Sequence, residues 1–136
     1  MSDSVWQRLK DEWNSTYPAL QLLGVRVDRI EEGFACLTLP FKEELTNPNG
    51  TVQGGIISTL ADAAASLAFL SLLGEGTQVA TIEFKINFLS PVWEGEMMAE
   101  AKVLRKGRTL GVMVVEVKGA DAKVMAKVLA TNIILP

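Results

Sequence analysis

Residues 54–73 constrain the fold more than any other part of the chain, because Asp62 is their only charge. Gly54 and Gly55 open this segment and Gly74 follows it, a pattern that predicts one long helix. One face of this helix carries Ile56, Leu60, Ala63, Ala64 and Leu67, and the opposite face carries Ser58, Asp62, Ala65, Ser66 and Phe69. A helix that is apolar on nearly every side is buried. We therefore expect a β-sheet that wraps around it.

The remaining segments supply the strands of that sheet. Apolar residues recur at helical spacing in residues 2–16 and at alternating positions elsewhere. The pattern predicts a hairpin of two strands at 24–31 and 34–39, followed by a loop at 41–55. Four further strands, in the style of an antiparallel meander, are predicted at 79–89, 96–105, 110–117 and 123–135. We expect one α+β domain, residues 1–136, with about six antiparallel strands around one long central helix and a short N-terminal helix.

Composition excludes several kinds of chemistry. The 136 residues include no histidine and a single cysteine, Cys36. A Ser-His-Asp triad, an imidazole acid or base, and a cysteine cluster for zinc or iron–sulfur are therefore excluded. We expect no metal and no cofactor, and we interpret Cys36 as a small packing residue. Any catalysis must use carboxylates, hydroxyls, amides, lysines or backbone dipoles.

Charge and hydropathy limit the partners. The formal net charge of −3 argues against nucleic acid, which binds to basic surfaces. Asp62 interrupts the longest apolar stretch and argues against a membrane span, and the first residues lack the apolar region of a signal peptide. These features predict a cytoplasmic protein. The mean hydropathy of +0.24 favours further burial, in an oligomer interface or a pocket for an apolar ligand.

Asp62 is the most informative single residue. Ser58 and Ser66 lie four residues before and after it, so hydroxyls flank the carboxylate along the helix. One interpretation is structural: the carboxylate is partly exposed and bonds to those serines or to a cation. The other is functional, because an isolated charge on so apolar a helix needs a reason.

The segment before the helix is the second candidate site. Residues 47–55 hold three glycines and two asparagines that favour sharp turns and close backbone approach. The first N–H groups of a helix are unpaired and lie at its positive end, so they can stabilise a developing oxyanion. The alternative is that the glycines only form a turn. The segment matches neither a P-loop nor a dinucleotide-binding motif.

Residues 47–62 read Asn-Pro-Asn-Gly-Thr-Val-Gln-Gly-Gly-Ile-Ile-Ser-Thr-Leu-Ala-Asp. This segment resembles the signature of hotdog-fold acyl-CoA thioesterases, Asn-x-x-Gly-x-x-His-Gly-Gly followed by Leu-x-Asp/Glu. The branch that it resembles includes the phenylacetate-degradation and 4-hydroxybenzoyl-CoA thioesterases. Segments 88–95 and 106–109 also resemble that family, and the likeness extends over roughly 22–135. It implies an antiparallel sheet around one long helix, assembly into homodimers or homotetramers, and active sites shared between two subunits.

The resemblance also implies roles for five residues. Asp62 would be the catalytic carboxylate, acting as nucleophile or as general base for water. The backbone N–H of Gly54 would polarise the thioester carbonyl, and Asn47 would orient the carbonyl or the water from the other subunit. Ser66 and Thr81 match positions that carry hydroxyls near the carboxylate.

The substrate-binding positions include one departure from the family pattern. Gln53 stands where the family carries histidine, two residues before Gly55 in the same motif. If that histidine shapes the loop, activity survives the change. If it tunes the carboxylate, activity falls. Arg105, Lys106 and Arg108 lie in one turn and would meet the phosphates of CoA, unless they form only a solvated hairpin tip.

The sequence therefore predicts hydrolysis of an acyl-CoA thioester to a free acid and CoA. A hotdog-fold dehydratase is excluded because those relatives depend on a catalytic histidine. The alternative is a protein that binds acyl-CoA or an apolar ligand without turnover. Gln53 favours this alternative, whereas Asn47, Gly54 and Asp62 favour the enzyme.

Overall fold

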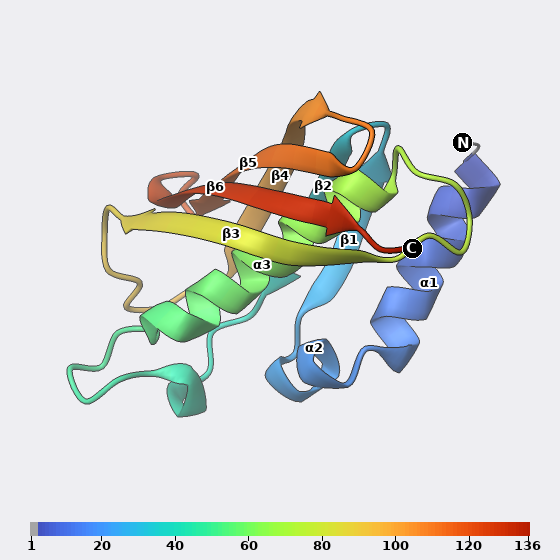
Figure 1. The fold of residues 1–136 in the computed structure, drawn as a ribbon. Helices are drawn as coiled ribbons and strands as arrows, with labels where there is room; N and C mark the ends of the chain where they lie inside the picture. Colours follow the sequence, from blue (N-terminus) through green and yellow to red (C-terminus); the bar gives the residue numbers. More distant parts are fainter. Residues whose placement is uncertain (1–2) are drawn as a thin grey trace.

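The structure is a computed structural model that describes residues 3–136. Six antiparallel strands form a single sheet, and the long helix α3 packs against its inner face (Figure 1). The elements, in chain order, are α1 (Asp3–Thr16), α2 (Pro18–Leu23), β1 (Arg26–Glu31), β2 (Phe34–Leu39), the 3-10 helix η1 (Glu43–Leu45), α3 (Gly54–Leu70), β3 (Val79–Phe88), β4 (Met97–Lys106), β5 (Leu110–Lys118) and β6 (Val124–Ile134). The predicted α+β class and the wrapped helix are confirmed.

The strand order departs from a simple meander. The sheet runs β1-β2-β4-β5-β6-β3, so β3 pairs with β6 at one edge and not with β4, the next strand in the chain. The segment between β3 and β4 forms no tight hairpin, because Val92 is buried and its carbonyl accepts the N–H of Val52, 3.0 Å away. That contact ties the crossing segment to the loop before α3 and leaves β3 as an edge strand.

Small residues on the inner face of the sheet let α3 approach closely. The approach is so close at Gly111 on β5 that no side chain fits there, because a Cβ atom would lie 2.4 Å from Cε1 of Phe69. The Phe69 ring therefore fills the core directly under the strand. Ala65 and Phe69 were expected on the face opposite the apolar one, but both are fully buried, because α3 contacts all six strands of the sheet.

The end of α3 differs from the expected end at residue 73. The helix ends at Leu70, and Ser71 follows as a buried cap. The Ser71 hydroxyl donates to the carbonyl of Ala68 (2.6 Å) and accepts the N–H of Gly33 (2.8 Å) in the β1–β2 turn. The indole N–H of Trp6 donates to the Ser71 carbonyl (3.1 Å). One buried serine thus joins α1, the hairpin and the end of α3.

The N-terminal segment contains one helix more than expected. The predicted helix over 2–16 is observed from Asp3, and Ser2 lies outside the described residues. A second helix, α2, begins with Pro18 in its first turn and ends at Gly24, whose φ of +87° is a left-handed cap. The first strand consequently begins at Arg26 rather than at residue 24. Between residues 3 and 136, the structure has no helix long and apolar enough to cross a bilayer.

Candidate active site

The carboxylate of Asp62 is held by the neighbouring strand. The hydroxyl of Thr81 on β3 donates a 2.6 Å hydrogen bond to Oδ1 of Asp62 on α3. Both residues are half-buried and line an open depression of about 220 Å³ with Ser58, Thr59 and Phe84. The expected bonds between Asp62 and its flanking serines do not form within the described chain: Ser58 donates to the carbonyl of Gly54 instead (2.9 Å), and Ser66 accepts from Asn132.

Ser66 lies one turn after Asp62 but bonds to a different residue. The side-chain amide of Asn132 on β6 donates to Oγ of Ser66 over 2.9 Å. Asn132 is fully buried, and its amide oxygen has no hydrogen-bond partner. Sequence reasoning missed this residue. The sequence did hold a signal for it. Inward and outward residues alternate along β6, and Asn132 occupies an inward position of the kind that Ala126 and Ala130 fill elsewhere on the strand.

The N-terminus of α3 forms the second half of the candidate site. The N–H groups of Gly54 and Gly55 find no acceptor within residues 3–136, as expected for the first residues of a helix. The ring of Phe88 covers Gly54 so closely that a Cβ atom at Gly54 would lie 3.0 Å from the ring carbon Cζ. An open depression of about 400 Å³ lies beside these residues, and Asn47 also lines it.

Asn47 organises the loop that leads into α3. Its side-chain oxygen accepts the backbone N–H groups of Asn49 (2.9 Å) and Thr51 (3.3 Å), and its amide nitrogen donates to the Thr51 hydroxyl (2.9 Å). The amide nitrogen carries two hydrogens, so one donor remains after the bond to Thr51. Within one chain, Asn47 thus shapes the loop and keeps a single N–H to offer to a ligand.

Gln53 and Gly55 both lie exposed at the start of α3. The backbone of Gln53 builds the turn: its N–H donates to Leu45 (2.9 Å) and its carbonyl accepts the N–H of Ile56 (2.9 Å). The side chain of Gln53 makes no capping bond. A Cβ atom at Gly55 would meet nothing within 4 Å, so this face of the helix is open.

The two halves of the site lie far apart within one chain. Gly54 and Asp62 are separated by eight residues of α3. At about 1.5 Å per residue, the two positions lie about 12 Å apart along the helix axis. A single thioester group cannot contact both, because its reacting atoms lie within about 3–3.5 Å of the groups that act on them.

Tyr17 is a second residue that sequence reasoning missed. This half-buried side chain precedes α2 and packs edge-on against Trp13, with 5.0 Å between the ring centroids. Burial, and after it the negative charge of Asp62, raises the pKa of the Tyr17 phenol above its ordinary value. The Tyr17 phenol therefore interacts electrostatically with Asp62, and its neutral form is favoured.

The predicted phosphate-binding residues lie elsewhere. Arg105, Lys106 and Arg108 are exposed at the turn between β4 and β5. None of the three forms an ion pair with another residue of the described chain. They line neither of the two depressions around α3, so one chain does not bring them together with Asp62 or Gly54.

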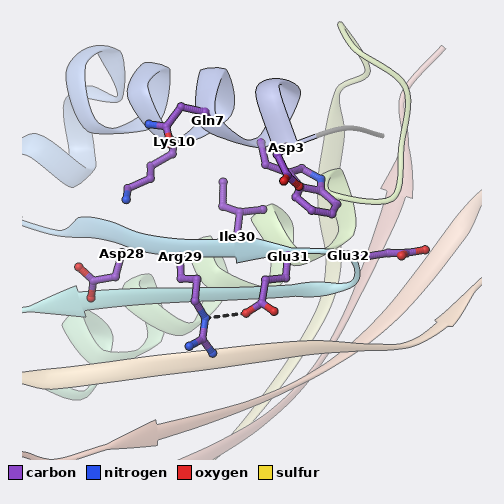
Figure 2. A pocket seen from close by; sticks show the side chains of 9 residues that line it. Asp3, Gln7, Lys10, Asp28, Arg29, Ile30, Glu31 and Glu32 are labelled. Atoms are coloured by element: carbon purple, nitrogen blue, oxygen red, sulfur yellow. Dashed lines mark ion pairs between the residues drawn. The ribbon is translucent and has the colours of Figure 1, made fainter.

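A larger depression lies between α1 and the β1–β2 hairpin, and it contains none of the predicted site residues. Its volume is about 560 Å³, and its walls carry charged side chains of α1, β1 and the hairpin turn (Figure 2). Arg29 on its rim is already paired with Glu31 (2.7 Å) and lies over the ring of Phe34. The carboxylate and helix N-terminus therefore remain the candidate active site.

Comparison with known proteins gives consistent matches. A family model described as the thioesterase superfamily matches residues 49–126, a range that includes Gly54, Asp62 and Thr81. A Saccharolobus solfataricus protein, whose name assigns it provisionally to the esterases, is 43% identical over 85% of this chain and 81% of its own length. The acyl-coenzyme A thioesterase PaaI of Escherichia coli is 28% identical over 93% of this chain and 88% of its own.

Solved structures agree with these sequence matches. A thioesterase family protein from Silicibacter pomeroyi superimposes with a TM-score of 0.88 and 34% identity, over 96% of this chain and 98% of that protein. The predicted hotdog fold and thioesterase assignment are thereby confirmed. With the family model matching more than half of the chain, the protein belongs to the thioesterase superfamily.

Proposed function

We propose that this protein hydrolyses the thioester of an acyl-CoA to a free carboxylic acid and CoA. The observation that carries the proposal is the pairing of Asp62 with Thr81, which aims a half-buried carboxylate into an open depression. Relatives support the substrate class, since two of them are named acyl-coenzyme A thioesterase PaaI, from Escherichia coli, and acyl-coenzyme A thioesterase 13, from Pongo abelii.

The proposed chemistry uses one carboxylate and one helix terminus. The free N–H of Gly54 donates a hydrogen bond to the thioester carbonyl oxygen and stabilises the negative charge that develops on it. Asp62 acts as general base on water or as nucleophile on the carbonyl carbon. In the general-base form, the water oxygen bonds to the carbonyl carbon, its proton passes to Asp62, and the C–S bond breaks. The departing thiolate then recovers that proton.

We propose further that two chains complete each site. The separation of about 12 Å between Gly54 and Asp62 prevents one chain from placing both on the same thioester. Two copies of α3 packed antiparallel would bring Gly54 of one chain beside Asp62 of the other. The two-fold axis would then pass near Ser58, midway between them. The free edge of β3 lies on the same side of the molecule as Asp62 and offers the partner chain a strand to pair with.

The exposed basic turn suits the anionic end of the substrate. Arg105, Lys106 and Arg108 have no carboxylate partner within the described chain, so their charges are available for phosphate groups. Arginine binds phosphate through two parallel hydrogen bonds, which lysine cannot match. We therefore assign the CoA phosphates to this turn, with the thioester reaching toward α3.

A thiol-release assay tests the proposed function. The purified protein is given short, medium, long and aromatic acyl-CoAs, alongside the variants Asp62→Ala and Asp11→Ala. Asp62→Ala is expected to lose at least about 100-fold in rate, the scale of a positioned acid–base group. Asp11 is exposed on α1 and serves as the matched control, so its variant should keep full activity. Equal activity in both variants would refute the assigned mechanism.

Binding without turnover is the second candidate, and Gln53 is the observation that favours it. Its exposed amide makes no capping bond and cannot titrate as the family's histidine does. This candidate predicts that acyl-CoA binds measurably, for example by calorimetry, while no free thiol appears with any substrate. The Gln53→His variant would then be expected to gain hydrolysis. Thiol release by the unmodified protein would exclude this candidate.

A further inference from the structure

We propose that Asn132 is a positioning residue of the thioesterase site, which orients the hydroxyl of Ser66 beside the reacting carboxylate. The proposal rests on the proposed function. It assigns a role to a buried side chain on β6, a strand that carries none of the predicted site residues.

Stability alone does not explain an asparagine at this position. Asn132 is fully buried on the inner face of β6, and its amide oxygen has no hydrogen-bond partner. A buried polar atom without a partner costs free energy, whereas an apolar side chain of similar size would not. Ala130, the preceding inward residue, shows that this face of the strand otherwise carries apolar side chains. A residue that costs stability points to another role.

Ser66 behaves differently from the other hydroxyl residues of α3. The hydroxyls of Ser58 and Thr59 each donate to the carbonyl four residues earlier, at 2.9 Å. Ser66 has no such bond within residues 3–136; instead its oxygen accepts the amide of Asn132. Because that bond occupies a lone pair of the oxygen, the hydroxyl proton stays available as a donor.

The strand register places this pair beside the carboxylate. Asn132 lies directly opposite Thr81 in the β3–β6 ladder. Thr81 donates to Asp62, and Asn132 donates to Ser66, one helical turn further along α3. Two neighbouring sheet residues thus hold two successive turns of the helix. Residues four apart on a helix lie about 5–6 Å from each other, so the Ser66 hydroxyl can reach a water or a thioester that Asp62 acts upon.

Asn132→Leu is the variant that separates this role from a structural one. Leucine removes the unpartnered oxygen and the donor to Ser66 while keeping a similar volume. We expect an unfolding temperature equal to or above that of the unmodified protein, and a kcat lower by between about 10-fold and 100-fold, the scale of a misplaced catalytic group. KM should change by less than about 3-fold, because substrate binding is not the function that is lost.

Thr38→Val provides a matched control. The Thr38 hydroxyl is also buried without a partner, but it lies on β2, between Arg26 and Met98 in the ladder and away from the site. This variant likewise removes an unpartnered buried oxygen without a change of shape. Its unfolding temperature should shift in the same direction as that of Asn132→Leu, while its kcat stays unchanged.

The coupling to Ser66 is measured with Ser66→Ala and the double variant. If Asn132 acts through Ser66, the double variant should be no slower than the slower single variant. Asn132→Ser, which keeps a hydroxyl donor, should retain more activity than Asn132→Leu and provides a smaller replacement if leucine does not fit. The proposal would be overturned if the losses in kcat of the two single variants multiplied in the double variant. Full activity of Asn132→Leu or of Asn132→Ala would also overturn it. If the unmodified protein released no thiol, the proposed function itself would fail, a result distinct from an active protein that tolerates the loss of Asn132.

Discussion

Thr81 and Asp62 are joined by a 2.6 Å hydrogen bond in which the hydroxyl is the donor. The bond links the edge strand β3 to the second turn of α3 beyond the glycine pair, and it uses only one of the two carboxylate oxygens. The other oxygen stays available for a water or a substrate in the depression that Asp62 lines. The strand therefore sets the orientation of the carboxylate without blocking it.

Removal of this bond should slow hydrolysis without unfolding the protein. Thr81→Val keeps the shape of the side chain and deletes the donor, so we expect kcat to fall by about 10-fold to 100-fold, the worth of a hydrogen bond to a charged group. Thr81→Ser keeps the hydroxyl and should stay within about 3-fold of the unmodified rate. Thiol-release kinetics on both variants measure the difference. Equal rates would show that the hydroxyl does not position Asp62.

Alanine substitutions at the adjacent residues Gly54 and Gly55 should have different effects on stability and activity. Gly55→Ala should stabilise the protein by about 0.5 kcal/mol, because alanine loses less backbone entropy and its Cβ meets nothing within 4 Å. Gly54→Ala should gain no stability and should lose at least about 10-fold in kcat, since its Cβ displaces the Phe88 ring, 3.0 Å away, at the helix terminus. Chemical denaturation and thiol release give the two quantities. A Gly54→Ala variant as stable and active as Gly55→Ala would contradict this account.

Gly111 should tolerate no side chain. An alanine Cβ would lie 2.4 Å from a carbon of the fully buried Phe69 ring, so Gly111→Ala is expected to destabilise the fold by roughly 1–3 kcal/mol, as overpacked cores do. The smaller side chain of Phe69→Leu should recover part of that loss in the double variant. Urea unfolding of the two single variants and the double variant tests this coupling, and purely additive effects would argue against it.

The proposed two-fold packing of α3 can be tested by cross-linking. Thr59 lies next to the expected axis, so two copies of Thr59→Cys should form a disulfide-linked dimer under mild oxidation. Thr16→Cys, exposed at the end of α1, is the off-axis control and should remain uncross-linked. Burial raises the pKa of the native Cys36 thiol to about 11, so little thiolate forms there near neutral pH and its background reaction is slow. A non-reducing gel shows the outcome, and equal cross-linking at both positions would contradict the packing.

The fold was predictable because its strongest signal is local. A helix with Asp62 as its only charge requires burial on most sides, and alternating residues around it supply the strands. The position of β3 was not predictable in this way. Its partner β6 lies about 50 residues further along the chain, and the buried Val92 that directs the crossing gives no distinctive pattern. Local periodicity reports which residues face inward, and it does not report which strands are neighbours.

The candidate site was predictable to the extent that its residues stand out chemically. Asp62 was conspicuous as a lone charge, and the bond to Thr81 agrees with the hydroxyl expected beside it. Asn132 was missed because its contact with Ser66 arises from the fold and not from neighbours in the sequence. Tyr17 was missed for the same reason, since only the fold brings its phenol into electrostatic interaction with Asp62. An asparagine on a strand and a tyrosine before a proline are ordinary in isolation.

The pairing of β3 with β6 has a consequence for how the molecule assembles. Strand β6 is the last strand of the chain, and it alone among the described strands holds β3 in the sheet. Contacts between distant segments form late in folding, because the intervening chain must first lose the entropy of closing a long loop. The helix that carries Asp62 can form early, but Thr81 reaches it only once residues 124–134 have been added. We therefore expect the contact between Asp62 and Thr81 to be among the last that the folding chain forms.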